Sequence, residues 1–285
     1  MIDNLFLSVG AMKAGTTWLY HQLREHPDIY FTPQKEIHYF ANKAGVGGQL
    51  NYRNRILKMQ DEIKRRIDWS PKAISENICD ISWYVQYANA KDIDNKWYES
   101  LFSMREKKSM FCADFSNLYC HMGIDGWKYA HEVSKNIKVV YTLRDPVSRL
   151  WSHYKFHMKW MNNENNEISV GYKYFKNLLE RPSFWANAEY AKNYNSLCES
   201  LLPDNVMILY FEDFRNDPIS NLKKVQEFIG VDEHIPKNEN INRKVNKTRE
   251  ISLPEEWKHH MFDKLYDECE RMRKIGIWHP SWSLD

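Results

Sequence analysis

Apolar residues along the chain follow two periodicities, which predict alternating strands and helices. Short continuous apolar runs bounded by turn-forming residues are typical of buried strands. Such runs occupy residues 5–9, 28–31, 110–114, 138–143 and 206–210. Helical spacing predicts helices over residues 16–25, 50–69, 82–90, 94–104, 172–180, 186–202, 217–229 and 254–275, and one that opens at Pro146. The alternation predicts an α/β fold with a central, mainly parallel sheet flanked by helices.

The length and composition favour one domain that spans residues 1–285. The 285 residues, of which 43% are hydrophobic, can bury one sizeable core and leave too little for two large domains. The 40 Lys and Arg residues nearly balance the 38 Asp and Glu residues, for a net charge of +2. A nucleic-acid partner is therefore not expected, and any basic site must be local. The charges of the helix over residues 50–69 indicate a solvated face.

Cysteine placement and apolar run lengths favour a reduced, cytoplasmic protein without a membrane span. The five cysteines show no paired spacing, and no apolar run reaches the length of about 18 residues that a membrane span needs. The first residues lead directly into a strand, without the pattern of a cleaved signal. No metal site is expected, because the adjacent His259 and His260 cannot share one helical face.

The strand over residues 5–9 runs into a loop that has the chemistry of a phosphate cradle. Lys13 precedes Gly15, and Thr16 and Thr17 then open a helix. Glycine permits close backbone approach to an anion, and the first amides of a helix are unpaired donors at its positive end. A Walker A loop needs Lys-Ser/Thr directly after its last glycine, which Gly15 lacks. The alternative is an ordinary strand-to-helix turn with a surface lysine.

The run Lys13-Ala14-Gly15-Thr16-Thr17 resembles the 5′-phosphosulfate loop of the sulfotransferases that use 3′-phosphoadenosine 5′-phosphosulfate (PAPS). The resemblance implies a P-loop-like strand-loop-helix unit that binds the donor PAPS and its product adenosine 3′,5′-bisphosphate (PAP). The implied 5′-phosphosulfate site comprises Lys13, Ala14, Gly15, Thr16, Thr17 and Trp18. Lys13 would also neutralise charge on the leaving phosphate.

A second unit begins where the strand over residues 138–143 ends. Arg144 follows this strand, and Pro146 near the first turn opens a helix that carries Ser152. Ligands bind at the carboxyl edge of open α/β sheets, where an arginine fork can hold a phosphate. In the resembled family an arginine and a serine eight residues later bind the 3′-phosphate. The alternatives are a salt bridge of Arg144 to Asp145 or a neighbour, and a plain exposed helical serine for Ser152.

The segment Lys35-Glu36-Ile37-His38-Tyr39-Phe40 resembles the Lys-Glu-x-His-Phe-Phe stretch of heparan-type sulfotransferases and their bacterial relatives. By this resemblance Glu36 is the general base. A carboxylate beside the donor loop suits that role, because an attacking hydroxyl or amine must lose a proton. His38 is the alternative base, since imidazole titrates near neutrality. A structural ion pair of Glu36 with Lys35 or Lys13 also stays open.

Residues after the strand over 110–114 are the candidate acceptor contacts. Asp114, Ser116 and Tyr119 correspond to a Glu-Lys-Thr/Ser-Pro-x-Tyr stretch of heparan-type members, whereas Phe115 replaces the family's lysine and Asn117 its proline. The departure at Phe115 favours a neutral or cationic acceptor stacked on the ring. Packing of Phe115 in the core is the equal alternative. Asp114, Phe115 and Tyr119 are thus the predicted substrate residues.

A basic stretch near residue 247 is a further donor candidate. Similar loops in the resembled family close over the donor with a lysine and an arginine two residues apart, which Lys247, Thr248 and Arg249 match. The resemblance then predicts a donor-binding core over about 1–40, 108–160 and 204–250. Acceptor-side insertions are predicted over about 41–107 and 161–200.

The sequence therefore predicts metal-independent sulfuryl transfer from PAPS to a hydroxyl or amine of a small acceptor. Positioning and charge stabilisation dominate such transfers. A specialised metabolite is the first candidate acceptor, and a carbohydrate or glycolipid is the second. The alternatives of another class are a P-loop-type small-molecule kinase and a non-catalytic nucleotide-binding module.

Overall fold

The computed structural model describes residues 1–67, 77–104, 110–161, 171–236 and 251–283. Five strands form one parallel sheet in the order β2-β3-β1-β4-β5. The strands are β1 (Asn4–Ser8), β2 (Ile29–Phe31), β3 (Phe111–Phe115), β4 (Asn136–Leu143) and β5 (Val206–Tyr210). The predicted α/β class is confirmed. All five predicted strands are present, and their ends differ from the predicted ones by at most two residues.

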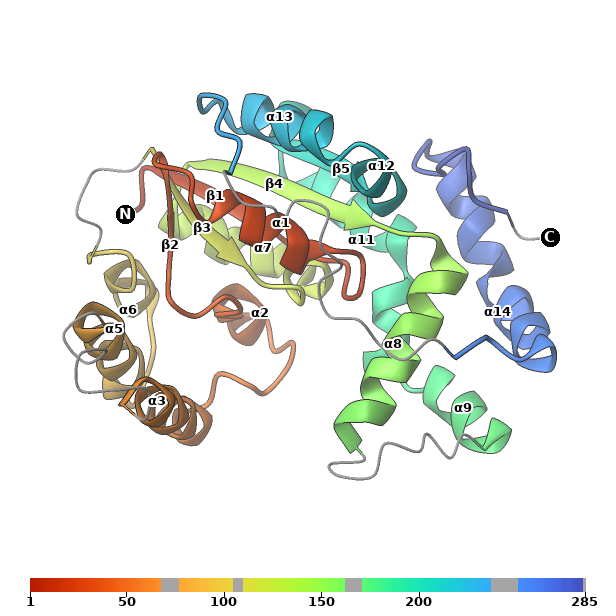
Figure 1. The fold of residues 1–285 in the computed structure, drawn as a ribbon, viewed down its shortest axis with the longest axis horizontal. Helices are drawn as coiled ribbons and strands as arrows, with labels where there is room; N and C mark the ends of the chain where they lie inside the picture. Colours follow the sequence, from red (N-terminus) through yellow and green to blue (C-terminus); the bar gives the residue numbers. More distant parts are fainter. Residues whose placement is uncertain (68–76, 105–109, 162–170, 237–250, 284–285) are drawn as a thin grey trace.

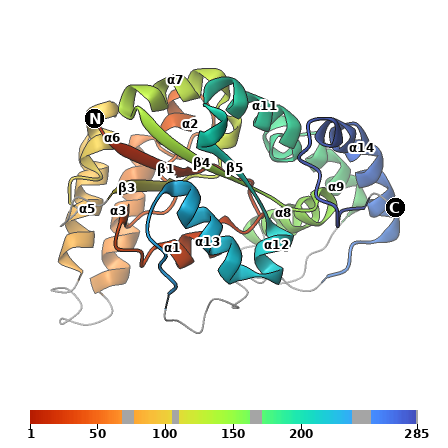
Figure 2. The same cartoon turned by 90° about the horizontal axis from the view of Figure 1, so that it is seen from above.

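Helices cover both faces of the sheet, so successive strand residues enter two different cores. Leu5 and Leu7 belong to one buried cluster, whereas Phe6 between them belongs to another. This is the period of two expected of a strand. Figure 2 shows α7 and α11 on one side of the strands and α1 and α13 on the other. The bounds are α1 (Thr16–Leu23), α7 (Gly123–Val133), α11 (Tyr190–Ser200) and α13 (Pro218–Ile229).

The remaining helices form two groups beside the sheet (Figure 1). One group comprises α3 (Tyr52–Ile67), α5 (Ile78–Asn89) and α6 (Asn95–Ser100). The other comprises α8 (Pro146–Met161), α9 (Tyr172–Leu179) and α14 (Glu255–Lys274), which share a third buried cluster. The short elements are α2 (Tyr39–Lys43), η1 (Tyr119–His121), α10 (Pro182–Trp185), η2 (Ala186–Ala188), η3 (Pro203–Asn205) and α12 (Phe211–Asn216). None of the helices within the described ranges is long and apolar enough to cross a membrane.

Two expectations about helices were wrong. The helix predicted over residues 186–202 is split, because Glu189 takes a non-helical conformation between η2 and α11. The charges of α3 are not all solvated, since Arg55 is only 1% exposed. Its guanidinium donates to the carbonyls of Tyr87 and Ala90 at 2.9 and 2.7 Å. Arg55 thus satisfies carbonyl groups at the end of α5, where the helix leaves them unpaired.

Gly15 is the tightest point of the turn that leads from β1 into α1. Its φ is +95°, and a Cβ there would lie 2.3 Å from Cζ of Phe214 in α12. That ring cannot yield easily, because it stacks on Trp18 with 4.9 Å between the ring centroids. The close approach therefore requires glycine at this position.

Replacing Gly15 with alanine is expected to destabilise the fold. Gly45→Ala is the matched control, because Gly45 also has a positive φ, +74°, but a Cβ added there would meet no atom within 4 Å. We expect Gly15→Ala to lower the free energy of unfolding by about 2 kcal/mol more than Gly45→Ala, since only Gly15→Ala adds overpacking. Urea unfolding measures both. Equal losses would show that the Phe214 contact is not the cause.

Candidate functional site

The candidate site lies along the carboxyl edge of the sheet, where ligands bind in parallel α/β folds. Glu36 follows β2, Asn117 follows β3, the loop with Lys13 follows β1, and Arg144 follows β4. The strand order β2-β3-β1-β4 therefore sets these residues in a row. Neighbouring strands lie about 4.8 Å apart, so four strands span a length that suits a nucleotide-sized ligand.

The loop after β1 is held by the neighbouring strand. Ala11 N donates to Thr142 O and Thr142 N donates to Gly10 O, both at 2.7 Å, so the ladder between β1 and β4 continues past the strand end. Lys13 then takes a left-handed conformation with φ 69°. These bonds fix the approach of the loop to α1.

Three backbone amides at the start of α1 are free to bind an anion. Within the part of the chain that the structure describes, the amides of Gly15, Thr16 and Thr17 donate no backbone hydrogen bond. The amide of Trp18 instead donates to Gly15 O at 2.9 Å. Of the amides in the predicted cradle, these three therefore have the donors that an anion could use. The ring of Trp18 is buried against Phe214.

Lys13 is a half-buried cation beside this loop. Its Nζ lies 4.5 Å from the ring centroid of Phe156 in α8. Burial, followed by the charges of Arg144, Lys159 and Lys155, lowers the pKa of Lys13 to about 8. No ion pair joins Lys13 to a carboxylate among the described residues. An anion bound here would relieve the repulsion from the other cations.

Arg144 lies directly against the same loop. Its Nη1 donates to Lys13 O at 3.3 Å, and its guanidinium lies 4.6 Å from the ring centroid of Phe211. The carboxylate of Asp145 caps α8 instead of pairing with Arg144, since it accepts from Ser148 N at 2.7 Å. The salt-bridge alternative for Arg144 is therefore not the arrangement observed.

Ser152 lies on α8, in the sequence between Arg144 and Phe156, whose ring contacts Lys13. It is 8% exposed, and Phe156 follows it by four residues, so the two side chains share one helical face. Ser152 thus lies on the face of α8 that carries Phe156, the ring next to Lys13. Lys247, Thr248 and Arg249 lie outside the described residues.

Glu36 lies on the other side of the loop and has three polar neighbours. Asn117 Nδ2 donates to its Oε1 at 3.1 Å, Lys35 Nζ lies 3.3 Å from the same oxygen, and His38 Nε2 lies 3.5 Å from Oε2. Burial alone would raise the pKa of Glu36, but the hydrogen bond from His38 and the charge of Lys35 together outweigh it and lower the pKa. Its side chain is 33% exposed. Glu36 is therefore an accessible carboxylate held in its charged form.

The segment that carries Glu36 is anchored to a buried hydrogen-bond network around Asp114. The carboxylate of Asp114 accepts from the hydroxyls of Ser116 and Tyr119, both at 2.6 Å, and from Tyr98 at 3.0 Å. Ser116 Oγ also accepts from His38 N at 2.9 Å. Burial raises the pKa of Asp114 even though the hydroxyl bonds oppose this.

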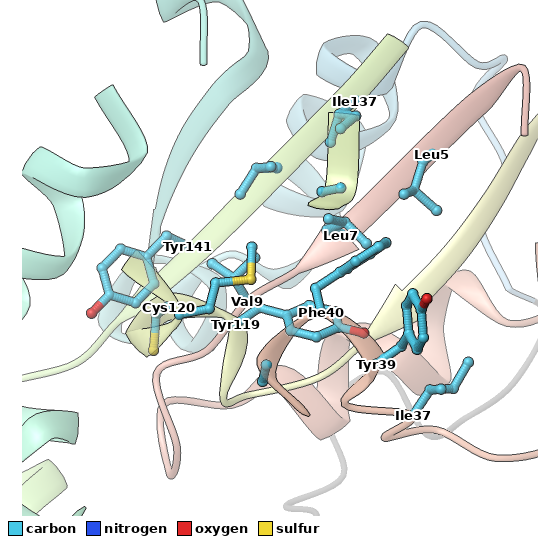
Figure 3. Packing of buried hydrophobic residues seen from close by; sticks show 14 of the residues in the cluster. Leu5, Leu7, Val9, Ile37, Tyr39, Phe40, Tyr119, Cys120, Ile137 and Tyr141 are labelled. Atoms are coloured by element: carbon cyan, nitrogen blue, oxygen red, sulfur yellow. The ribbon is translucent and has the colours of Figure 1, made fainter. Parts of the chain in front are cut away.

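The predicted acceptor contacts do not reach the surface. Asp114 and Phe115 are 1% exposed and Tyr119 is fully buried. The Phe115 ring packs against Phe6 with 5.5 Å between the ring centroids, so the core alternative holds for this residue. Figure 3 shows Tyr119 beside Phe40 in the core on the other face. The prediction that these three residues contact the acceptor is not supported, because all three are buried.

Sequence reasoning missed two polar side chains of the site, Lys35 and Asn117. The sequence indicated Lys35 only as an ion-pair partner of Glu36, and Asn117 only as a departure from a motif. Both follow the carboxyl ends of strands, and that placement was the available signal. Within the described ranges no group of three or more His, Cys, Asp or Glu side chains is arranged to hold a metal.

Comparisons with known proteins find sulfotransferases. Carbohydrate sulfotransferase 15 of Homo sapiens is 23% identical over 238 residues, which cover 79% of this chain and 39% of that protein. Membrane-associated sulfotransferase kil1 of Dictyostelium discoideum is 24% identical over 161 residues, which cover 56% of this chain and 24% of that protein. The chain thus spans less than half the length of either relative.

Solved structures show the same fold. A sulfotransferase from Alicyclobacillus acidocaldarius superposes with a TM-score of 0.66 at 19% identity, over 96% of both chains. The sulfotransferase domain of the Synechococcus PCC 7002 olefin synthase gives 0.57 at 17% identity, over 98% of both chains. A model of the sulfotransferase family matches residues 6–235, a range that includes the donor loop, Glu36, Arg144 and Ser152. The chain belongs to the sulfotransferase family.

Proposed function

We propose that this protein transfers a sulfuryl group from PAPS to a hydroxyl or amine of a small-molecule acceptor. PAPS is the sulfuryl donor of the family. The observation that carries the proposal is the placement of Lys13 and Arg144 on and against the loop that leads to the free amides at the start of α1, without an ion-paired carboxylate among the described residues. Two cations and a row of amides favour a multiply charged phosphate ligand.

Each part of the site has a role in this proposal. PAPS supplies the sulfuryl group together with a phosphate as leaving group. The amides of Gly15, Thr16 and Thr17 hold the 5′-phosphate, and Lys13 neutralises charge that develops there. Arg144 and Ser152 hold the 3′-phosphate at the other end, an assignment supported by their positions directly after β4 and on α8. Such fixed charges stabilise a transition state because they need no reorganisation during the reaction.

Glu36 is the proposed general base. Its lowered pKa keeps it ionised at neutral pH, and a third of its side chain is open to an acceptor. His38 orients this carboxylate from 3.5 Å and is the alternative base. A base must lie within hydrogen-bond reach of the proton it takes, and Glu36 is the more exposed of the two side chains.

The acceptor is best described as a small molecule with a free hydroxyl or amine. The stacking argument for a neutral or cationic acceptor no longer applies, because Phe115 is in the core. A carbohydrate acceptor is the second candidate, favoured by the similarity to carbohydrate sulfotransferase 15. A kinase is disfavoured, since no Lys-Ser/Thr follows Gly15.

Removing the Glu36 carboxylate tests the reaction. We expect Glu36→Gln to lower the rate of PAPS-dependent sulfation by about 100-fold or more, because proton transfer by a positioned base contributes this much. Transfer of radiolabelled sulfate to a panel of phenols, amines and sugars measures the rate. Calorimetry should find the affinity for PAP nearly unchanged.

The companion variant His38→Asn separates the two candidate bases. A larger loss in His38→Asn than in Glu36→Gln would assign the base to His38. Wild-type protein that binds PAP but sulfates nothing on the panel would indicate a non-catalytic module. Failure of the wild type to bind PAP would remove the donor assignment.

The lowered pKa of Lys13 predicts that PAP binding is accompanied by proton uptake. With a pKa of about 8, Lys13 is half protonated at pH 8 in the free protein, and it loses its charge as the pH rises further. A bound phosphate stabilises the ammonium and raises the pKa, so PAP binding at pH 8 should take up about half a proton. Calorimetry in buffers of different ionisation enthalpy measures this uptake. Lys13→Arg stays charged and should take up almost none, and an equal uptake in both proteins would contradict this role of Lys13.

A further inference from the structure

Lys35 lies between the donor loop and the proposed base. Its Nζ is 3.4 Å from Thr17 Oγ1 in the first turn of α1 and 3.3 Å from Glu36 Oε1. The side chain is 20% exposed. The Lys35 ammonium therefore lies between the proposed 5′-phosphate site at the start of α1 and the proposed base Glu36.

One N–H donor of the Lys35 ammonium is available to a ligand. An ammonium carries three N–H donors, and Thr17 and Glu36 are its two hydrogen-bond partners among the described residues. Glu36 Oε1 also accepts from Asn117 at 3.1 Å, so this carboxylate has a partner besides Lys35. The remaining donor of Lys35 can therefore meet an oxygen that enters between Thr17 and Glu36.

Lys13 and Lys35 approach the loop from different sides. Lys13 lies next to Phe156 of α8 and Arg144, which follows β4, whereas Lys35 belongs to the segment after β2. In the strand order β2-β3-β1-β4 these are opposite sides of β1. The two cations can therefore serve two different anionic groups.

We propose that Lys35 binds the transferring sulfuryl group through its non-bridging oxygens, an inference that rests on the proposed sulfotransferase function. In the transfer the acceptor atom donates an electron pair to sulfur and forms the new bond. The bond from sulfur to the bridging oxygen breaks, its electron pair stays with the 5′-phosphate, and Glu36 takes the acceptor's proton. Lys35 holds the sulfuryl oxygens during this exchange, and Lys13 faces the phosphate.

This role differs from that of a simple ion pair with Glu36. Neighbouring Lys and Glu side chains at a partly exposed position attract each other only weakly in water. The contact with Thr17 sets the ammonium against the donor loop, where a charge-assisted hydrogen bond to a sulfuryl oxygen is strong. PAPS carries that oxygen and PAP lacks it. Comparing the two ligands therefore distinguishes sulfuryl binding by Lys35 from a simple ion pair with Glu36.

The experiment compares PAPS with PAP on the same protein. Dissociation constants are measured by calorimetry without acceptor, and chromatography confirms that PAPS stays intact. We expect Lys35→Ala to weaken PAPS binding by about 10-fold while PAP affinity changes less than about twofold, since one charge-assisted hydrogen bond is lost. Lys35→Arg, which keeps a charge, should fall between the wild type and Lys35→Ala.

Lys43→Ala is the matched control. Lys43 is an exposed lysine in the neighbouring α2, and its Nζ lies 5.3 Å from the ring centroid of Tyr129. Its removal changes the net charge equally and should leave the ratio of the two dissociation constants unchanged. Equal weakening of PAPS and PAP in Lys35→Ala, or no change in either, would overturn the proposal and leave the sulfotransferase function standing. A wild type that binds neither ligand would overturn the proposed function itself.

Discussion

The pairing of β1 with both β3 and β4 is the constraint on which the rest of the site depends. The ladder from β1 to β4 extends into the loop through the bonds between Gly10, Ala11 and Thr142. Arg144 follows β4 by one residue and therefore meets the carbonyl of Lys13. A slip of one residue in this register would turn each strand side chain to the opposite face and displace Arg144 from the loop. The two ends of the proposed donor site are thus set by backbone hydrogen bonds.

The buried hydrogen-bond network around Asp114 positions the segment that carries the proposed base, Glu36. A buried carboxylate is costly unless it is well hydrogen-bonded, and three hydroxyls meet this requirement here. Through Ser116 the network reaches the backbone of His38, which begins α2 in a left-handed conformation. Asp114 and Tyr119, expected to touch an acceptor, instead shape the segment that presents Glu36. Their importance is therefore in positioning.

Charge is concentrated in the site although the whole chain is nearly neutral. Lys13, Arg144 and Lys35 lie around one loop, while the net formal charge of the chain is only +2. Burial of Lys13 and the nearby charge of Arg144 make the ammonium unfavourable in the free protein and lower the pKa of Lys13. A ligand with several negative charges reverses this repulsion. The electrostatic design therefore favours binding of a polyanionic donor over that of a neutral molecule.

The sequence by itself determined the strands and the family and predicted the donor loop, because these depend on local patterns: apolar runs, a glycine turn and short motifs. It also indicated Glu36 and Arg144, which lie in such motifs. The assignment of residues 41–107 and 161–200 to the acceptor side stays a prediction. Only the tertiary structure decided that Phe115 is in the core, since a strand pattern separates two faces without saying which one a ligand meets. The strand order, a long-range property, likewise decided that Lys35 and Asn117 meet Glu36 beside the loop of Lys13.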